Sequence, residues 1–243
     1  QAADMKLLDL TLDSPAENIA LDEAMLEEAE AGRSVDDVLR LWESSQAAVI
    51  IGRSSRIHDE VDVSSCAKEA IPILRRCSGG TSVVIGPGCL MYSVVLSYER
   101  NPGLRMVDVA HKFVLEKVVA AVKQFVPSAM LQGTSDLTLG GRKFSGNSLR
   151  CKRDHLLYHG TLLYNFSLDQ IGRFLKSPPR QPEYRGQRSH LEFVTNLGLD
   201  APQLRMALAD QWQVSEVFEA WPESLTTQLV AQRYSQATWH HRL

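Results

Sequence analysis

Three strand-like runs follow one another in the middle of the chain with short connections between them. Leu137–Leu139 is followed by Gly140-Gly141, and the runs Lys143–Leu149 and Leu156–Phe166 come next. A Gly-Gly pair between apolar runs is typical of a tight hairpin turn, which joins antiparallel strands. We therefore expect these runs to be neighbouring antiparallel strands of one sheet.

The rest of the chain places helices between groups of strands. Ser14 and Glu17 form a capping-box pattern at the start of a helix that Gly32 can end, and Met106–Phe125 has the spacing of an amphipathic helix. Further strand-like runs are Leu39–Trp42, Ala47–Gly52, Ile71–Cys77, Ser82–Ile85 and Leu90–Ser97, and further helical runs are Asp169–Leu175, Pro202–Trp212 and Glu223–Tyr234. This order predicts an α+β fold, a mixed and largely antiparallel sheet with packed helices, in one domain over residues 1–243.

Composition excludes several classes of protein. The net charge is −3, so nothing global indicates binding to nucleic acid or to a membrane surface, and no apolar run approaches membrane-spanning length. The four cysteines have no C-x-x-C spacing, and no signal peptide is evident, so we expect a reducing, cytoplasmic location. The segment Ser177–Ser189 has three prolines and three arginines, which predicts a mobile surface loop.

The segment Arg75–Thr81 reads RRCSGGT. Glycines let the backbone approach a ligand closely, and successive N–H groups can bind an anion. Arginine adds bidentate recognition of carboxylate or phosphate. Taken alone, so short a segment is more typical of a hairpin turn with exposed arginines.

The segment Gly140–Ser148 reads GGRKFSGNS. If side chains alternate along this strand, Lys143 and Ser145 share a face, which would suit a developing oxyanion or a phosphate. Asp136, on the preceding strand, could hold a metal ion or a ribose hydroxyl. The alternative is a solvated hairpin, because most lysines are exposed.

The segment Tyr158–Leu163 reads YHGTLL. His159 beside Gly160 in an apolar strand invites a catalytic interpretation, although a lone histidine in such a place is more often a satisfied core residue.

Together these three segments resemble the R-R-x-S-G-G-G, G-x-K-x-S-G and H-H-G-T-L-L elements of lipoate–protein ligases, and the similarity extends from about residue 6 to 241. The resemblance implies the biotin/lipoate–protein ligase-like fold and a two-step reaction. Lipoate or octanoate is activated with ATP and Mg²⁺ to an acyl-adenylate, and the acyl group then passes to a carrier lysine.

The resemblance also implies roles for residues and partners. Lys143 would be the essential residue and would act electrostatically, and Asp136 would lie near the phosphate or its metal ion. The acceptor would be a lipoyl domain of the 2-oxoacid dehydrogenase E2 type or a glycine-cleavage H protein. The chain stops four residues after Trp239, so we expect no C-terminal accessory domain and a possible separate accessory subunit. The residues expected to contact the acyl-adenylate are Arg76, Ser78, Gly79, Gly80, Thr81, Asp136, Ser145, His159 and Gly160.

The chain departs from the family pattern mainly on the adenylate side. Thr81 replaces the third glycine of the loop, Ile85-Gly86 replaces a His-Asp pair, and Ser135 replaces an asparagine. These changes keep other functions open. One is a lipoyl or octanoyl transferase that works from an acyl carrier without ATP, through a cysteine nucleophile. A biotin–protein ligase and a non-catalytic binder of lipoyl domains are the others.

A last expectation concerns docking of the acceptor. Basic residues cluster around the second motif and meet only Asp154, so an acidic carrier could bind there. A solvated hairpin explains the same charges equally well. The basic residues are Arg142, Lys143, Arg150, Lys152 and Arg153.

Overall fold

The computed structural model describes residues 5–34, 36–178 and 181–242. The strands of this described part are β1 (Met5–Asp9), β2 (Asp37–Trp42), β3 (Ala48–Ile51), β4 (Ile73–Arg75), β5 (Val83–Ile85), β6 (Cys89–Ser97), β7 (Met130–Gln132), β8 (Asp136–Leu139), β9 (Arg142–Cys151), β10 (His155–Leu163) and β11 (Val214–Val217). Its helices are α1 (Pro15–Glu30), α2 (Ile57–Glu60), α3 (Val63–Lys68), α4 (Val107–Lys123), α5 (Asp169–Phe174), α6 (His190–Phe193), α7 (Ala201–Gln211), α8 (Glu223–Leu229) and α9 (Ala237–His240). Short 3₁₀ turns η1 (Pro102–Arg105) and η2 (Glu183–Arg185) and a π-helical turn η3 (Val230–Tyr234) complete the chain.

An eight-stranded sheet in the order β11-β1-β2-β6-β10-β9-β8-β7 forms the centre of the molecule, and a smaller sheet, β4-β3-β5, lies beside it. In the large sheet only β1 pairs in parallel, with β2 and β11, and the other neighbours are antiparallel. The expectation of a mixed, largely antiparallel sheet with packed helices is confirmed.

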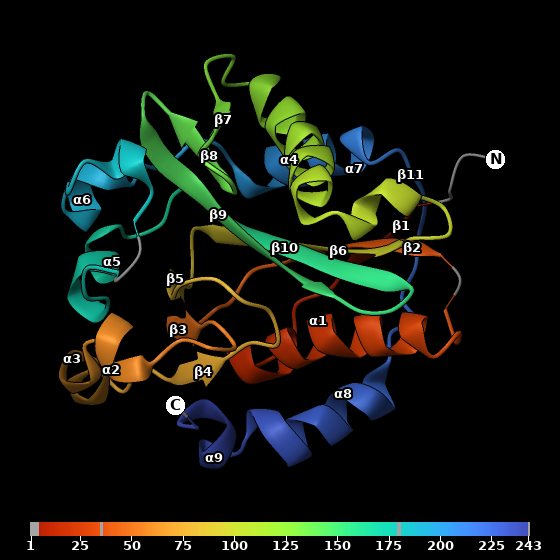
Figure 1. Ribbon diagram of the computed structural model, residues 1–243, viewed down its shortest axis with the longest axis horizontal. Coiled ribbons are helices and arrows are strands. Elements are labelled where there is room, and N and C mark those ends of the chain that lie inside the picture. The colour runs from red at the N-terminus through yellow and green to blue at the C-terminus, as the bar shows by residue number, and fades with distance from the viewer. Residues whose placement is uncertain (1–4, 35, 179–180, 243) are drawn as a thin grey trace.

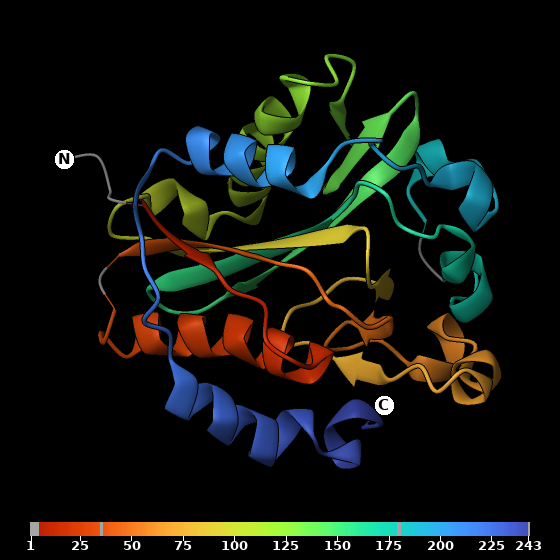
Figure 2. The same ribbon diagram turned by 180° about the vertical axis from the view of Figure 1, so that it is seen from behind.

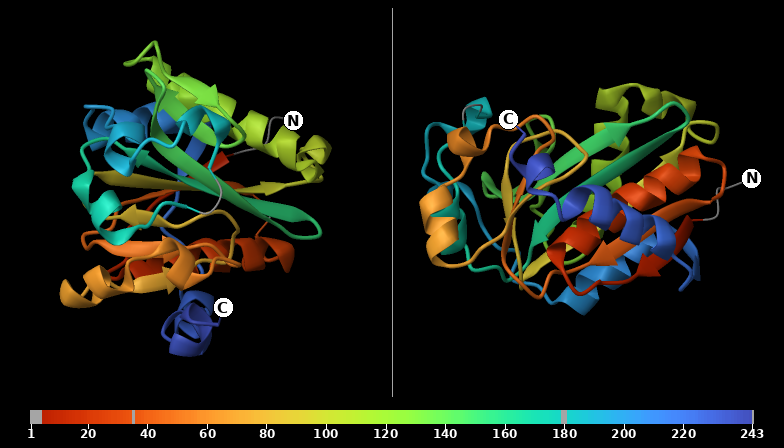
Figure 3. Two further views of the ribbon diagram at one scale, coloured as in Figure 1. Left: turned by 60° about the vertical axis from the view of Figure 1, so that its left-hand side comes forward. Right: turned by 90° about the horizontal axis from the view of Figure 1, so that it is seen from below.

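Helices cover both faces of the large sheet. Helices α4 and α7 pack together on one face, α1 lies on the other, and α8 and α9 form a further layer outside α1 (Figures 1 and 2). The smaller sheet and the short helices α2, α3, α5 and α6 lie at one end of the large sheet (Figure 3). The site described below lies at this end, where the two sheets meet.

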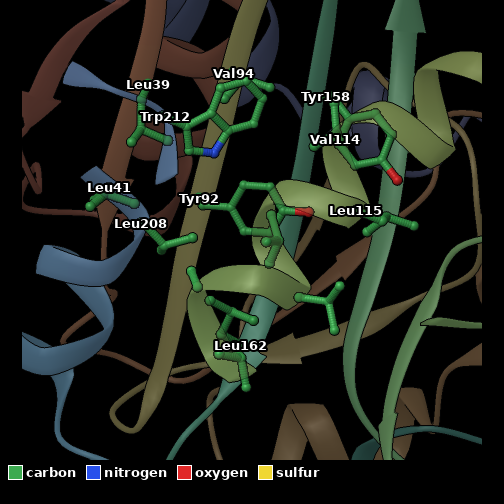
Figure 4. Packing of buried hydrophobic residues seen from close by; sticks show 14 of the residues in the cluster. Leu39, Leu41, Tyr92, Val94, Val114, Leu115, Tyr158, Leu162, Leu208 and Trp212 are labelled. Carbon is green, nitrogen blue, oxygen red and sulfur yellow. The ribbon is translucent and has the colours of Figure 1, made fainter. Parts of the chain in front are cut away.

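The largest apolar cluster lies between the large sheet and helices α4 and α7. Tyr92 and Tyr158 from neighbouring strands pack with Val114 and Leu115 of α4 and with Trp212, which follows α7 (Figure 4). These side chains are almost fully removed from water, so burial of apolar surface fixes the sheet face against the helices.

Local sequence signals explain where several elements begin and end. Ser14 and Glu17 form the capping box of α1. Gly32, just past the end of α1, has φ +71°. Gly140 and Gly141 both have positive φ in the β8–β9 turn, which is the conformation that a two-residue hairpin turn requires.

The sequence did not reveal every element. Strands β1, β7 and β11 and helices α2, α3, α6 and α9 were not expected, because they are short and lack a clear period. Residues 181–189 of the expected surface loop are irregular apart from the short turn η2, and all but the buried Arg185 are exposed or half-buried. Their mobility stays a prediction, and residues 179 and 180 lie outside the described part. Within that part, no helix is long and apolar enough to cross a membrane.

Candidate active site

Two cavities lie side by side between the large and small sheets. The larger has a volume of about 390 Å³, and Ile19, Trp42, Ile50 and Met91 give it an apolar end. The rest of its wall is polar. Thr134, Ser135 and Asp136 from the segment before β9 lie with Lys143, and His159 and Arg76 also line it, Arg76 next to Ile50, to whose carbonyl it donates.

The smaller cavity has a volume of about 100 Å³. Lys176, Arg185 and His190 contribute basic side chains to its wall. Thr81, Val83, Lys143, Gly146 and Thr161 line both cavities.

Lys143 is held in place by a carboxylate. Its Nζ lies 2.6 Å from Oδ1 of Asp136, and the other carboxylate oxygen accepts a hydrogen bond of 2.7 Å from the Tyr184 hydroxyl. Burial and the neighbouring Asp136 raise the pKa of Tyr184, which therefore stays a neutral donor. Tyr184 lies in η2, so the segment expected to be a mobile surface loop supplies a hydrogen bond to this part of the site, and its Gln181 and Pro182 line the larger cavity.

The expectation that Lys143 and Ser145 share a strand face is wrong. Thr138 pairs with Lys143 and Leu137 pairs with Ser145, so Phe144 is an extra residue, a β-bulge. Residues that pair across antiparallel strands lie on one face. Ser145 therefore lies on the side of Leu137, and its hydroxyl accepts a hydrogen bond from the Asn147 side chain at 3.0 Å. Ser145 still contributes to the wall of the smaller cavity.

His159 lines the larger cavity but does not contact Lys143. It pairs across the sheet with Ser148, and both of its ring nitrogens have partners. Nε2 lies 2.6 Å from the Ser78 hydroxyl, and Nδ1 lies 3.2 Å from Asp22. Sequence reasoning missed Asp22, although Asn18 and Asp22 are spaced as polar residues on the buried face of α1.

Arg76 is a buried cation at the wall of the larger cavity. Its Nε donates to the Ser78 hydroxyl at 3.0 Å, and its terminal nitrogens donate to the carbonyls of Gly79, Thr81 and Ile50. Burial lowers its pKa to about 10. Among the described ion pairs none includes Arg76, so an anionic ligand in the cavity would meet an uncompensated charge.

The glycines of the motifs have different reasons to be glycine. A Cβ on Gly160 would lie 1.8 Å from Oδ1 of Asn147, which also accepts a hydrogen bond from Tyr92. Gly80 has φ +83° and packs under Arg76, whereas a Cβ on Gly79 would meet nothing within 4 Å. Gly160 is therefore required by packing inside the sheet.

The cysteines lie away from both cavities. Cys66, Cys77 and Cys89 are buried, and Cys151 is exposed at the far end of β9. Burial raises the pKa of all three buried thiols, that of Cys66 to about 11. None of the four lines either cavity, so the cavity walls present no thiol nucleophile.

The residues around Asp136 do not form a metal site by themselves. No group of three or more His, Cys, Asp or Glu side chains that could hold a metal ion occurs among the described residues. Both oxygens of Asp136 are already engaged, by Lys143 and Tyr184.

The expected basic edge is partly neutralised. Lys152 lies 2.7 Å from Glu27, and Arg153 lies 2.8 Å from Asp154. Within the part of the chain that the structure describes, Arg142 and Arg150 make no ion pair. Arg142 and Arg150 are therefore the basic residues of β9 without an ion pair in that part, since Lys143 pairs with Asp136.

Comparison with known proteins identifies the family. Residues 14–224 match the model of the lipoyl protein ligase A/B catalytic domain, and the chain belongs to this family. It is 27% identical over 190 residues to a probable lipoate-protein ligase A of Mycoplasma pneumoniae, which covers 78% of this chain and 54% of that protein. It is 28% identical over 185 residues to lipoate–protein ligase 1 of Staphylococcus aureus, covering 75% of this chain and 53% of that one.

Among solved structures, the chain is similar to a bi-partite lipoate protein ligase of Thermoplasma acidophilum, with a TM-score of 0.81, 22% identity, and coverage of 100% of this chain and 98% of that one. The fold is thus that of lipoate–protein ligases. The chain spans about half the length of the first curated relatives that it matches.

Proposed function

We propose that this domain catalyses protein lipoylation as a lipoate–protein ligase. It would bind a lipoyl or octanoyl adenylate and transfer the acyl group to a lysine of an acceptor lipoyl domain. The observation that carries the proposal is the position of Lys143, which lines both the larger cavity with its apolar end and the smaller cavity. The wall of the smaller cavity carries Lys176, Arg185 and His190 among apolar side chains and Glu60. An acyl-adenylate has one apolar arm and one anionic arm, and the bond that reacts joins them.

The side chains suit this chemistry. The apolar end at Ile19, Trp42, Ile50 and Met91 would take the acyl chain. Lys143, fixed by Asp136, would stabilise the negative charge that develops on the acyl oxygen when the acceptor amine attacks. Arg76, with Gly80 and Thr81 beside it, would face the phosphate or carboxylate.

The relatives named as lipoate–protein ligases support ATP as the second substrate, as does a similar solved structure of lipoate-protein ligase A bound with ATP. Magnesium would have to be held mainly by the nucleotide phosphates, because Asp136 alone does not form a site for it. We therefore assign it no step. The free thiols are compatible with a reducing, cytoplasmic location, which stays a prediction.

The transferase alternative lacks support from the site. A thioester intermediate needs a cysteine that reaches the acyl carbon, and no cysteine lines the cavities. Acyl transfer should therefore need an activated acid, as the adenylate or as acid with ATP.

We also propose that residues 1–243 act as a single catalytic domain with a separate accessory subunit. The similar ligase of Thermoplasma acidophilum is described as bi-partite and was studied with its E2 lipoyl domain. The chain should then transfer a ready-made adenylate more readily than it makes one, because closing a lid over a site excludes water during activation.

The test is intact-mass analysis of an apo-lipoyl domain, of the E2 or glycine-cleavage H type, after incubation with the chain. One reaction contains lipoyl-AMP, and the other contains lipoate, ATP and magnesium. We expect acylation in the first and slow acylation in the second. No acylation from lipoyl-AMP would contradict the proposed function, and equal rates would contradict the need for a partner.

A further inference from the structure

Five buried polar side chains form a hydrogen-bonded series next to the larger cavity. Arg40 donates to Asp22 at 2.6 Å, and Asp22 lies 3.2 Å from Nδ1 of His159. Nε2 of the same ring lies 2.6 Å from the Ser78 hydroxyl, which accepts from Nε of Arg76 at 3.0 Å. This series of side chains comes from β2, α1, β10 and the loop after β4, and each of the five residues is at most 7% exposed.

The hydrogen bonds define where the protons lie. Burial by itself would raise the pKa of Asp22, but Arg40, His159 and Ser93 together hold it below its ordinary value. An ionised Asp22 can only accept, so Nδ1 of His159 carries a proton. Ser78 already accepts from Arg76, and its own proton needs an acceptor, which a bare Nε2 supplies. The tautomer of His159 with its proton on Nδ1 gives every group in this series a hydrogen-bond partner.

Serine, histidine and carboxylate in this order also occur in hydrolases, where the serine is a nucleophile. Here the serine cannot take that role. Ser78 is fully buried, it lines neither cavity, and Arg76 occupies a lone pair of its oxygen. The last member of the series is Arg76, which does line the larger cavity.

We propose that Asp22, His159 and Ser78 form a positioning relay that fixes Arg76 at the cavity wall for an anionic ligand. Without Ser78, the Nε of Arg76 would lose its partner in the described structure, and the guanidinium could rotate away from the carbonyls of Gly79 and Thr81. The three residues act through Arg76 and need not touch the substrate. This inference rests on the proposed function for the identity of the ligand.

The kinetic test uses Ser78→Ala, with lipoyl-AMP as the substrate and an apo-lipoyl domain as the acceptor. Loss of a hydrogen bond to a charged group costs roughly a 10- to 100-fold factor in binding. We expect KM for lipoyl-AMP to rise by about that factor, with kcat changed much less, because Arg76 would hold the anion equally in the ground and transition states. Ser97→Ala is the control, a largely buried serine on β6 that lines neither cavity. Thermal unfolding establishes that both variants are folded at the assay temperature, and Ser78→Ala should be the less stable of the two because it leaves buried partners in Arg76 and His159.

A spectroscopic test is independent of turnover. The ¹⁵N shifts of His159 in the wild-type chain should show a proton on Nδ1 and none on Nε2, and Asp22→Asn should change this pattern. If the wild type acylated no carrier, the proposed function would fail while this measurement still tested the relay. A doubly protonated ring, an unchanged KM in Ser78→Ala, or an acyl group trapped on Ser78 by acid quench would overturn the relay.

Discussion

Arg75 and Arg76 are neighbours in the sequence and both are buried, but their side chains bind different parts of the structure. Arg75 donates to the carbonyls of Gly52 and Ser55, each at 2.8 Å, and to that of His240 in α9. Arg76 donates to the loop at the cavity. The motif therefore combines one arginine that ties the C-terminal helix to the small sheet with one that serves the site.

The same division runs through the other motifs. Lys143 lines both cavities with its cation, whereas the Ser145 hydroxyl is buried and bonded to Asn147 at the wall of the smaller cavity. Gly79 has open space beside it, and Gly160 is packed against Asn147. Each motif thus contains some residues that line the site and others that pack inside the protein. Substitutions in matched pairs can separate the two groups.

The largest difference in the rate of acyl transfer is expected between Lys143→Ala and Ser145→Ala. Removing one pre-organised charge donor from a developing oxyanion costs on the order of 10²–10³ in rate. Ser145→Ala should change the rate only a few-fold, because its hydroxyl contacts Asn147 on the other face. Single-turnover transfer from lipoyl-AMP measures both. Near-wild-type turnover of Lys143→Ala would remove the site assignment, and equal losses would remove the division of the strand into two faces.

The arginine pair should separate stability from activity. Lysine lacks the planar fork that reaches several carbonyls at once. Arg75→Lys should lower the free energy of unfolding by about 2–4 kcal/mol, because buried carbonyls lose their donors. Urea unfolding measures this loss, and the folded fraction should keep its KM for lipoyl-AMP.

Arg76→Lys should raise KM for lipoyl-AMP by roughly 10-fold or more, because the ligand loses a guanidinium charge that the loop holds in place. It should also lose some stability, since Arg76 donates to the carbonyls of Ile50, Gly79 and Thr81, so the rise in KM is what distinguishes it from Arg75→Lys. The unfolding midpoint is the control for folding. If the effects were exchanged between Arg75 and Arg76, the assignment of the two sides of the motif would be wrong.

Local patterns were sufficient to predict most of the fold. The capping box at Ser14 and the Gly140-Gly141 turn act over a few residues, so sequence alone placed α1 and the β8–β9 hairpin correctly. Period-two alternation failed at Phe144, because a β-bulge adds one residue without a clear sequence signal.

The site was less predictable, because its partners come from distant segments. Asp22 and His159 are 137 residues apart, and Tyr184 reaches Asp136 from a segment rich in proline and arginine. Such contacts depend on tertiary packing. The one local hint was the polar pair Asn18 and Asp22 on the buried face of α1, since polar side chains on a buried helix face need partners.

The glycine pair tests which motif glycines are needed for packing. Gly160→Ala would place Cβ against Asn147 and 2.9 Å from the Tyr92 ring, and such overpacking typically costs about 1–3 kcal/mol. Gly79→Ala has open space and no positive φ, so its unfolding free energy should stay within about 0.5 kcal/mol of wild type. Thermal or urea unfolding distinguishes them. A stable Gly160→Ala would mean that Asn147 can move aside.

The smallest effect, on KM for the acceptor, is expected for the basic residues on β9 and just after it. Some of these residues form ion pairs and others do not. Lys152 and Arg153 pair with Glu27 and Asp154, so reversing both mainly disturbs local ion pairs.

Arg142 and Arg150 make no ion pair within the described residues, so their field is available to an acidic acceptor. Changing both to glutamate should raise KM for such an acceptor by about 3- to 10-fold and weaken its dependence on salt. The Lys152→Glu/Arg153→Glu variant is the matched control and should change KM less than about 2-fold. Titrating the acceptor at two ionic strengths measures both quantities. If the two double variants behaved alike, the acceptor would not distinguish paired from unpaired charge, and its docking surface would have to lie elsewhere than β9.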